Sequence, residues 1–324
     1  MNIVRIVRIV RLVCAIALSA LALSAAAQYP NKPIRIIVPF PAGSATDTVG
    51  RILGQSVSAA IGQAVVIENK VGADGAIAGA EVAKAAPDGY TLLLATNSPI
   101  AVVPALRKSP PYDPITDFTP ITDVGRYTFF LFVNAEVPVK TFGELIDYAK
   151  ANPGKLAYAT GNTTGIVSFA QMNALADIQM LQIPYKGEPA AITDLIGGRV
   201  QLMWATPTTG LAHVKDGKLR ALVTSRKQRS PILPDVPTIA EAGLPKFSIL
   251  SWAALYGPAK MPRDLTERIN KEFAAAMNRP DVIAQMNKQA FALTPSTPEE
   301  LAAFTREQID DYRRVLRAAG VQAE

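Results

Sequence analysis

The stretch Ile34–Asp47, which reads IRIIVPFPAGSATD, limits the possible fold more than any other part of the chain. Its largely apolar run Ile34–Val38 predicts a strand that is covered on both faces. Two prolines then end the strand, Gly43 turns the chain, and a helix begins at Ser44. At such a turn the free N–H groups and the dipole of the helix favour a bound anion. The spacing of Ser44 and Asp47 also fits a helix cap, so the stretch predicts either a cap or an anion site.

The first 27 residues have the three parts of a secretory signal peptide. Three arginines form a positively charged start, Leu12–Leu23 is an apolar segment of twelve residues, and small residues follow up to Ala27. The apolar segment is too short for a membrane span and has the wrong flanks for one. We therefore expect export of the chain and cleavage after Ala27.

The composition of the other 297 residues excludes several classes of function. They contain no cysteine, and His213 is the only histidine of the chain, so we expect no thiol nucleophile, metal site or cofactor. Thirty basic residues against 27 acidic ones give a net charge of +3 without a basic run, which argues against nucleic-acid binding. No segment of this part reaches the length of unbroken apolar sequence that a membrane span needs.

Strands alternate with helices along the chain, which predicts an α/β fold with mainly parallel sheets. Five strands are expected in a compact second lobe, namely Phe129–Val133, Leu156–Thr160, Met180–Tyr185, Val200–Ala205 and Leu219–Thr224. The segment 108–120, rich in proline and aspartate, predicts a long surface loop. Two helices, 263–277 and 298–318, are expected to close the chain.

The order of these elements predicts two lobes. The first comprises residues 28–125 and 254–324, and the second comprises residues 126–253. The chain would cross between them twice, near Asp123–Tyr127 and near Ser248–Ala253. Two crossings form a hinge around a cleft, and clefts between such lobes bind ligands.

The segment Leu156–Ser168, LAYATGNTTGIVS, repeats the opening architecture in the second lobe. A strand ends at Thr160, and a loop of Gly, Asn and Thr leads into a helix that is expected to begin near position 165 or 166. Thr163 or Thr164 is the expected cap. A cap and an anion contact use the same free donors, so both interpretations apply together.

Several segments in a fixed order resemble one family of receptors. They are YPNKPIRIIVPFPAGSATD, AAPDGYTLLLATNS, IPYKG, GKLRALVTS, LPDVPTIAEAG and TPEELAAF. From Tyr29 to about Gly320 the chain is similar to the periplasmic solute receptors of the tripartite tricarboxylate transporter system, also called Bug proteins. The resemblance implies a two-lobe periplasmic binding protein of type II, a Venus flytrap without catalytic activity. It also implies a small carboxylate ligand and docking on the membrane subunits of a transporter, and we expect a monomer.

In the resembled family, the ligand carboxylate is held between the two strand-to-helix loops, largely by backbone amides and ordered waters. The positions of this chain expected to contact ligand are Phe40, Ala42, Gly43, Ser44, Asp47, Thr160, Asn162, Thr163, Thr164, Gly165, Ser168, Tyr185, Trp204 and Ala205. Further candidates are Asp74, Asn97 and Ser98. We expect Asp47 to hold its loop through backbone N–H groups or a water, because its charge would repel an anion.

Some of these positions depart from the family pattern, and the departures bear on the ligand. The differing residues are Ala42, Ser44, Asn162, Thr164, Ser168, Trp204 and Ala205. In the family, proline stands at the position of Ala42 and glycine at that of Ser44. Glycines stand at the positions of Asn162 and Thr164, and histidine at that of Ser168. The pair Trp204-Ala205 stands where the family often has Phe-Asp. They fall in the expected site, so no particular ligand is carried over from a relative.

Other functions are less consistent with the sequence. An extracytoplasmic hydrolase would need a nucleophile, a base and an orienting group, and no G-x-S-x-G motif is present. The stretch VGADGAIAG lacks the glycine spacing of a dinucleotide site and is interpreted as a tight turn. A sensor that passes its ligand signal to a membrane histidine kinase would share the fold and the site, so it stays an alternative to transport.

Overall fold

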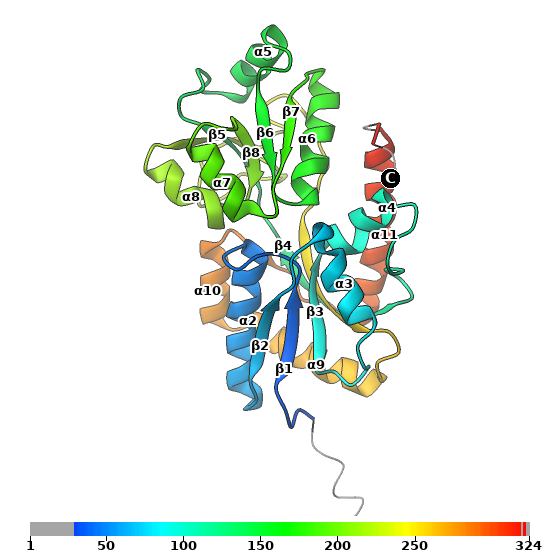
Figure 1. The fold of residues 1–324 in the computed structure, drawn as a ribbon. Coiled ribbons are helices and arrows are strands. Elements are labelled where there is room, and N and C mark those ends of the chain that lie inside the picture. Colours follow the sequence, from blue (N-terminus) through cyan, green and yellow to red (C-terminus); the bar gives the residue numbers. More distant parts are fainter. Residues whose placement is uncertain (1–28, 319, 322–324) are drawn as a thin grey trace, which may run out of the picture.

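The computed structural model describes residues 29–318 and 320–321, which form two lobes stacked end to end (Figure 1). The predicted signal peptide, residues 1–27, lies outside the described residues, so cleavage after Ala27 stays a prediction. Among the described residues, no helix combines the length and apolarity that crossing a membrane requires.

The lobe that contains the first strand, which we call lobe 1, is built on a six-stranded sheet. Its order is β11-β4-β10-β3-β1-β2. The strands are β1 (Ile34–Val38), β2 (Val65–Asn69), β3 (Thr91–Thr96), β4 (Phe118–Arg126), β10 (Trp252–Pro258) and β11 (Ala292–Leu293). The helices are α2 (Ala45–Ile61), α3 (Ala76–Ala83), α4 (Val103–Leu106), α9 (Arg263–Met277), α10 (Pro280–Lys288) and α11 (Pro298–Ala318), with short helical turns η1 (Ala73–Gly75) and η2 (Ser98–Val102).

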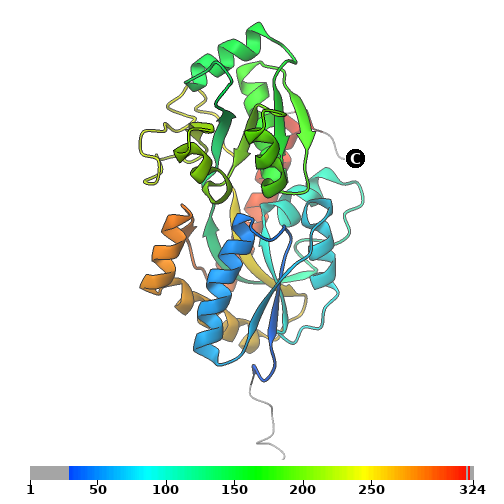
Figure 2. The ribbon, with the colours of Figure 1, turned by 60° about the vertical axis from the view of Figure 1, so that its left-hand side comes forward.

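Strand β1 is covered on both faces, as its sequence predicts. Ile36 and Ile37 point to opposite faces and are 1% and 0% exposed. Ile36 belongs to a core that includes residues of α2, α9 and α10, whereas Ile37 belongs to a core that includes residues of α3 and α11. The two groups of helices lie on opposite sides of the sheet (Figure 2).

Lobe 2 is built on a five-stranded sheet in the order β7-β6-β8-β5-β9. Its strands are β5 (Phe130–Asn134), β6 (Ala157–Thr160), β7 (Leu181–Pro184), β8 (Leu202–Ala205) and β9 (Leu219–Thr224). Its helices are α5 (Phe142–Ala151), α6 (Thr163–Ala176), α7 (Glu188–Ile196) and α8 (Pro207–Lys215). The five strands predicted for this lobe are confirmed.

The prediction of mainly parallel sheets is wrong, because both sheets are mixed. Strand β10 runs antiparallel to β3 and β4, and β5 runs antiparallel to β8 and β9. Strands β5 and β10 each enter their sheet from the other lobe rather than through a local β-α-β crossover. The alternation of strands and helices predicts parallel pairing only for strands joined by such a crossover.

The closing helices α9 and α11 have the bounds that the sequence predicts. The surface loop expected at 108–120 is shorter than predicted. Strand β4 begins at Phe118, within the stretch expected to be a loop. The sequence did not reveal this largely buried strand, because Pro120 and Asp123 are untypical of one. The chain passes from lobe 1 to lobe 2 between β4 and β5, and returns between β9 and β10. The lobe boundaries at 125/126 and 253/254 stay a prediction.

Candidate functional site

The first strand-to-helix turn brings the start of α2 to the edge of lobe 1 that faces lobe 2. Gly43 has a φ of 80°, which favours glycine and lets the chain turn into Ser44. The Ser44 Oγ accepts a hydrogen bond from the Asp47 amide at 3.3 Å, so the predicted cap is confirmed. Within the described chain, the amides of Ala45 and Thr46 donate to no protein acceptor. These two N–H groups are therefore available to a ligand.

Asp47 fastens this turn. Its carboxylate accepts hydrogen bonds from the Gly43 amide at 3.0 Å, from Arg51 Nε at 3.0 Å and from Asn69 Nδ2 at 2.9 Å. Burial alone would raise the pKa of Asp47, but these bonds outweigh it and hold the pKa below its ordinary value. The expectation that Asp47 holds the loop through a backbone N–H is confirmed.

The second turn starts α6 two residues earlier than expected. Asn162 is the cap, and its Oδ1 accepts from the Gly165 amide at 2.9 Å, so the prediction of Thr163 or Thr164 as cap is wrong. Both residues instead belong to the first turn of the helix, where their amides have no protein acceptor among the described residues. An asparagine in extended conformation offers its amide oxygen at the distance that a cap requires.

Side chains of this helix start reach directly across to lobe 1. Asn97 donates from Nδ2 to the Thr164 hydroxyl at 2.9 Å, and the hydroxyls of Ser98 and Thr163 lie 2.5 Å apart. Asn97 and Thr163 are 0% exposed. The lobes are therefore closed on each other in this structure.

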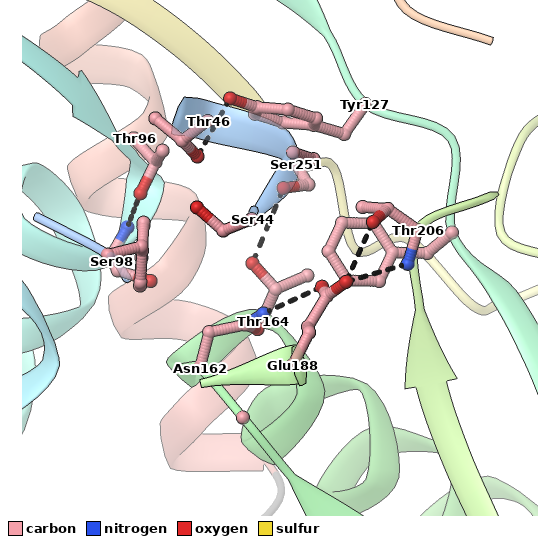
Figure 3. Close-up of a pocket in the computed structure, with 14 residues that line it drawn as sticks. Ser44, Thr46, Thr96, Ser98, Tyr127, Asn162, Thr164, Glu188, Thr206 and Ser251 are labelled. Atoms are coloured by element: carbon pink, nitrogen blue, oxygen red, sulfur yellow. Dashed lines mark hydrogen bonds between the residues drawn. The ribbon is translucent and has the colours of Figure 1, made fainter. Parts of the chain in front are cut away.

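A small cavity lies between the two helix starts, and we call it the inter-lobe cavity (Figure 3). It is lined by Phe40, Ser44, Ala45, Thr46, Thr96, Ser98, Tyr127, Phe129, Gly161, Asn162, Thr164, Glu188, Thr206 and Ser251. Its volume is about 30 Å³, which leaves room for about two water molecules. An organic ligand would need the lobes to separate before it could enter.

A wider outer cavity of about 300 Å³ adjoins the inter-lobe cavity. Phe40, Gly161 and Asn162 line both spaces, so they form the partition between them. Thr160, Asp74 and Tyr185 line the outer cavity only. The Tyr185 hydroxyl donates to Asp194 at 2.8 Å, and burial raises the pKa of Asp74.

Glu188, at the first position of α7, is a lining residue that the sequence reading missed. Its carboxylate receives hydrogen bonds from Asn162, from the amide and hydroxyl of Thr206, and from the hydroxyl of Thr209. Burial raises the pKa of Glu188, and these donors only partly offset the effect. A signal was present, because Glu188 follows Gly187 at the end of the loop after β7, as Ser44 follows Gly43 at the end of the loop after β1.

Several hydroxyl groups of the inter-lobe cavity were also missed. They belong to Thr46, Thr96, Tyr127, Thr206 and Ser251. Figure 3 shows them arranged around Ser44, Asn162 and Glu188. Thr96 ends β3 and Thr206 follows β8, so both occupy strand ends like those of the two predicted loops.

Some expected site residues lie elsewhere in the structure. Ala42 and Gly43 are exposed beside the first turn, and Asn97, Thr163 and Gly165 are buried without lining either cavity. The residues Ser168, Trp204 and Ala205 are buried and line neither cavity. Trp204 stacks on Phe247 with ring centroids 5.5 Å apart, in the core. Their contact with a ligand stays an untested prediction that this placement does not favour.

Comparison with known proteins shows what the chain is related to. Residues 49–321 match the family described as tripartite tricarboxylate transporter family receptor, TctC. The solved structure of the periplasmic binding protein BugD is 31% identical and gives a TM-score of 0.87, over 91% of this chain and 100% of that chain.

Two further solved structures were determined with a ligand. Rpa4515 of R. palustris with adipate is 29% identical, with a TM-score of 0.88 over 92% of this chain and 100% of that one. MatC of Rhodopseudomonas palustris with bound malate is 29% identical, with a TM-score of 0.84 over 89% and 100%. The predicted family and two-lobe fold are thus confirmed. This chain belongs to the tripartite tricarboxylate transporter receptor family, whose Bug-type members are periplasmic binding proteins and not enzymes.

Proposed function

We propose that the inter-lobe cavity binds a small organic carboxylate for delivery to the membrane subunits of a tripartite transporter. The observation that carries the proposal is the pair of helix starts from opposite lobes. The unpaired amides of Ala45 and Thr46 in α2 and of Thr164 in α6 lie at one cavity. Two helix N-termini add partial positive charge there, which favours an anion.

The hydroxyl groups around these amides complete the polar wall. Ser44, Ser98 and Ser251 supply groups that both donate and accept hydrogen bonds. Binding near 1 μM would correspond to about −8 kcal/mol, which a few charge-assisted bonds together with burial in the cleft can supply.

Opening and closing of the lobes is the mechanical part of the proposal. The inter-lobe cavity of this structure is too small for an organic ligand, so the ligand enters an open form, meets the α2 turn first, and keeps the lobes from closing as far as they do here. Lobe 2 then closes, and the start of α6 contacts the ligand from the other side. A ligand bound more tightly by the closed form shifts the population toward it.

The relatives support the class of ligand and the compartment. Rpa4515 was solved with adipate and MatC with malate, which are both small dicarboxylates. BugD is a periplasmic binding protein, and the predicted signal peptide of this chain fits delivery to that compartment.

Thermal-shift screening followed by calorimetry tests the proposal. The panel holds adipate, malate and succinate, each beside its dimethyl ester, which keeps the carbon skeleton and removes the charge. We expect at least one free acid to raise the melting temperature and to bind one-to-one, while its ester does not bind. Equal binding of acid and ester would contradict an anion site.

A further inference from the structure

Glu188 places an anionic group in the wall of a cavity that is otherwise built for anions. It is 5% exposed and is the one charged side chain among the described residues that line the inter-lobe cavity. No arginine or lysine of the described chain lines the same space to offset it. A buried carboxylate without a counter-charge is unfavourable unless its partner arrives from elsewhere.

The hydrogen bonds around Glu188 fix the carboxylate as an acceptor. The Thr206 amide, which can only donate, points to Oε2 at 3.2 Å. Asn162 must present its Nδ2 to Oε1, at 3.1 Å, because its Oδ1 already accepts from the Gly165 amide. These two groups therefore present a proton to the carboxylate, whereas the hydroxyls of Thr206 and Thr209 can either donate or accept.

The two carboxylate oxygens are unequally occupied. Oε2 receives the amide and the hydroxyl of Thr206, and the Thr209 hydroxyl shares its one proton between Oε2 at 3.0 Å and the Thr206 carbonyl oxygen at 3.2 Å. Oε1 receives the single donor Asn162. An ionised carboxylate has about four acceptor positions, so Oε1 keeps capacity for one more donor, and Glu188 lines the cavity.

The wall of the cavity therefore carries two opposite kinds of group. The starts of α2 and α6 present free N–H groups, and Glu188 presents a free acceptor position with negative charge. A ligand with negative charge only would meet repulsion at Glu188, and that repulsion discriminates against it. A ligand with one carboxylate and one positively charged donor can bond both to the free N–H groups and to Glu188.

We propose that Glu188 is the specificity-determining residue of the site and selects small carboxylates that also carry a protonated amine. This inference rests on the proposed function, since it assumes that the ligand carboxylate faces the helix starts. It narrows the ligand from carboxylates in general to zwitterionic ones, with a hydroxyl donor as the weaker substitute for the ammonium group.

Matched ligands test this on the wild-type protein without any variant. Succinate, malate and aspartate share four carbons and differ at the second carbon by hydrogen, hydroxyl or ammonium. Adipate and 2-aminoadipate form a longer pair. Calorimetry at pH 7 is expected to show the amine-bearing member of a pair binding at least ten times more tightly than the plain acid, with malate intermediate.

The outcomes separate this inference from the proposed function. Plain acids that bind as tightly as their amines would overturn the role of Glu188 and leave the carboxylate receptor intact. Failure of every compound in both series would overturn both. Binding of the amines alone supports both.

The variant Glu188→Gln keeps the shape and removes the charge. We expect the preference for aspartate over succinate to fall by at least tenfold. Asp147→Asn is the control, because Asp147 is exposed on α5 of the same lobe and lines neither cavity. The same preference in Glu188→Gln as in wild type, with an unchanged circular dichroism spectrum, would overturn the assignment.

Discussion

The Asn97 side chain of lobe 1 donates a hydrogen bond of 2.9 Å to the Thr164 hydroxyl of lobe 2. Asn97 also accepts from the Ser251 hydroxyl at 3.2 Å, so both polar atoms of its side chain are hydrogen-bonded. Thr164 lines the inter-lobe cavity and starts the helix whose free amides face it. Closure of the lobes and completion of the binding site are therefore carried by the same residues.

Thr164→Val is expected to weaken ligand binding. The valine keeps the size of the side chain but leaves the Asn97 donor without its partner. The loss of about 1–2 kcal/mol corresponds to roughly 5–30-fold in affinity, measured by calorimetry.

Thr208→Val is the matched control for that variant. The Thr208 hydroxyl donates to Gln289 at 2.9 Å, which is another bond between the lobes, but neither residue lines the inter-lobe cavity. Its loss affects closure alone, so the affinity should change less than in Thr164→Val. An equal or larger loss in Thr208→Val would contradict the place of Thr164 in the site.

Gly43→Asp is expected to abolish carboxylate binding while the protein still folds. A side chain at position 43 meets no atom within 4 Å, but the φ of 80° adds strain of about 1 kcal/mol. The new charge would lie beside the first turn of α2, outside the cavity wall but close to the free N–H groups that the ligand anion is expected to meet. Gly43→Asn has the same size and strain without the charge, so it should retain binding. Calorimetry of the two variants side by side distinguishes charge from strain.

Ser168→Ala is expected to leave ligand affinity unchanged. The Ser168 hydroxyl is buried, has no hydrogen-bond partner in the described chain, and does not line the cavity. Removing an unpaired buried hydroxyl should keep or raise the free energy of unfolding, which urea titration measures. A tenfold weaker affinity would show that Ser168 contributes to ligand binding.

Asp47→Asn is expected to destabilise the protein at neutral pH and to lose this effect in acid. The folded pKa of Asp47 lies below its unfolded value of about 3.9. Its stabilising contribution is therefore complete above pH 4 and is lost as the pH falls through the folded pKa. Urea titrations from pH 3 to pH 7 should show the two free energies of unfolding converging at the acid end. Parallel curves would show that the charge of Asp47 does not stabilise the folded protein.

Glu188→Gln is expected to show the opposite trend. The folded pKa of Glu188 is raised by burial among Asn162, Thr206 and Thr209, and Tyr127 is a titratable neighbour whose own pKa the Glu188 charge raises. The wild-type contribution is complete below the unfolded pKa of about 4.3 and is lost as the pH rises through the folded pKa. The variant should therefore gain stability relative to wild type between acid and neutral pH. A constant difference over that range would show that Glu188 has no shifted pKa.

Local sequence patterns predicted the parts of the fold that depend on local interactions. The strand at Ile34–Val38, the cap at Ser44 and the role of Asp47 all follow from residues within one turn of the chain. Strand direction was not predictable in this way, because β5 and β10 each enter a sheet from the other lobe. Strand β4 was not predicted, because it contains polar residues whose hydrogen-bond partners are distant in the chain.

The composition of the site was predictable only in part, for a physical reason. Burial of Glu188 depends on the close approach of Gly161 and on Thr206, which is 18 residues away in the chain. Trp204 lies on β8, whose four residues are all buried, so alternation does not reveal which face meets the cleft.

Calorimetric titration with a panel of small carboxylates, on protein first stripped of bound ligand by unfolding and refolding, tests the central claim most directly. We predict one-to-one binding of at least one carboxylate to the wild type and to Gly43→Asn, and none to Gly43→Asp. A panel that binds to none of the three proteins, or binding that survives in Gly43→Asp, would contradict a carboxylate site between the two helix starts.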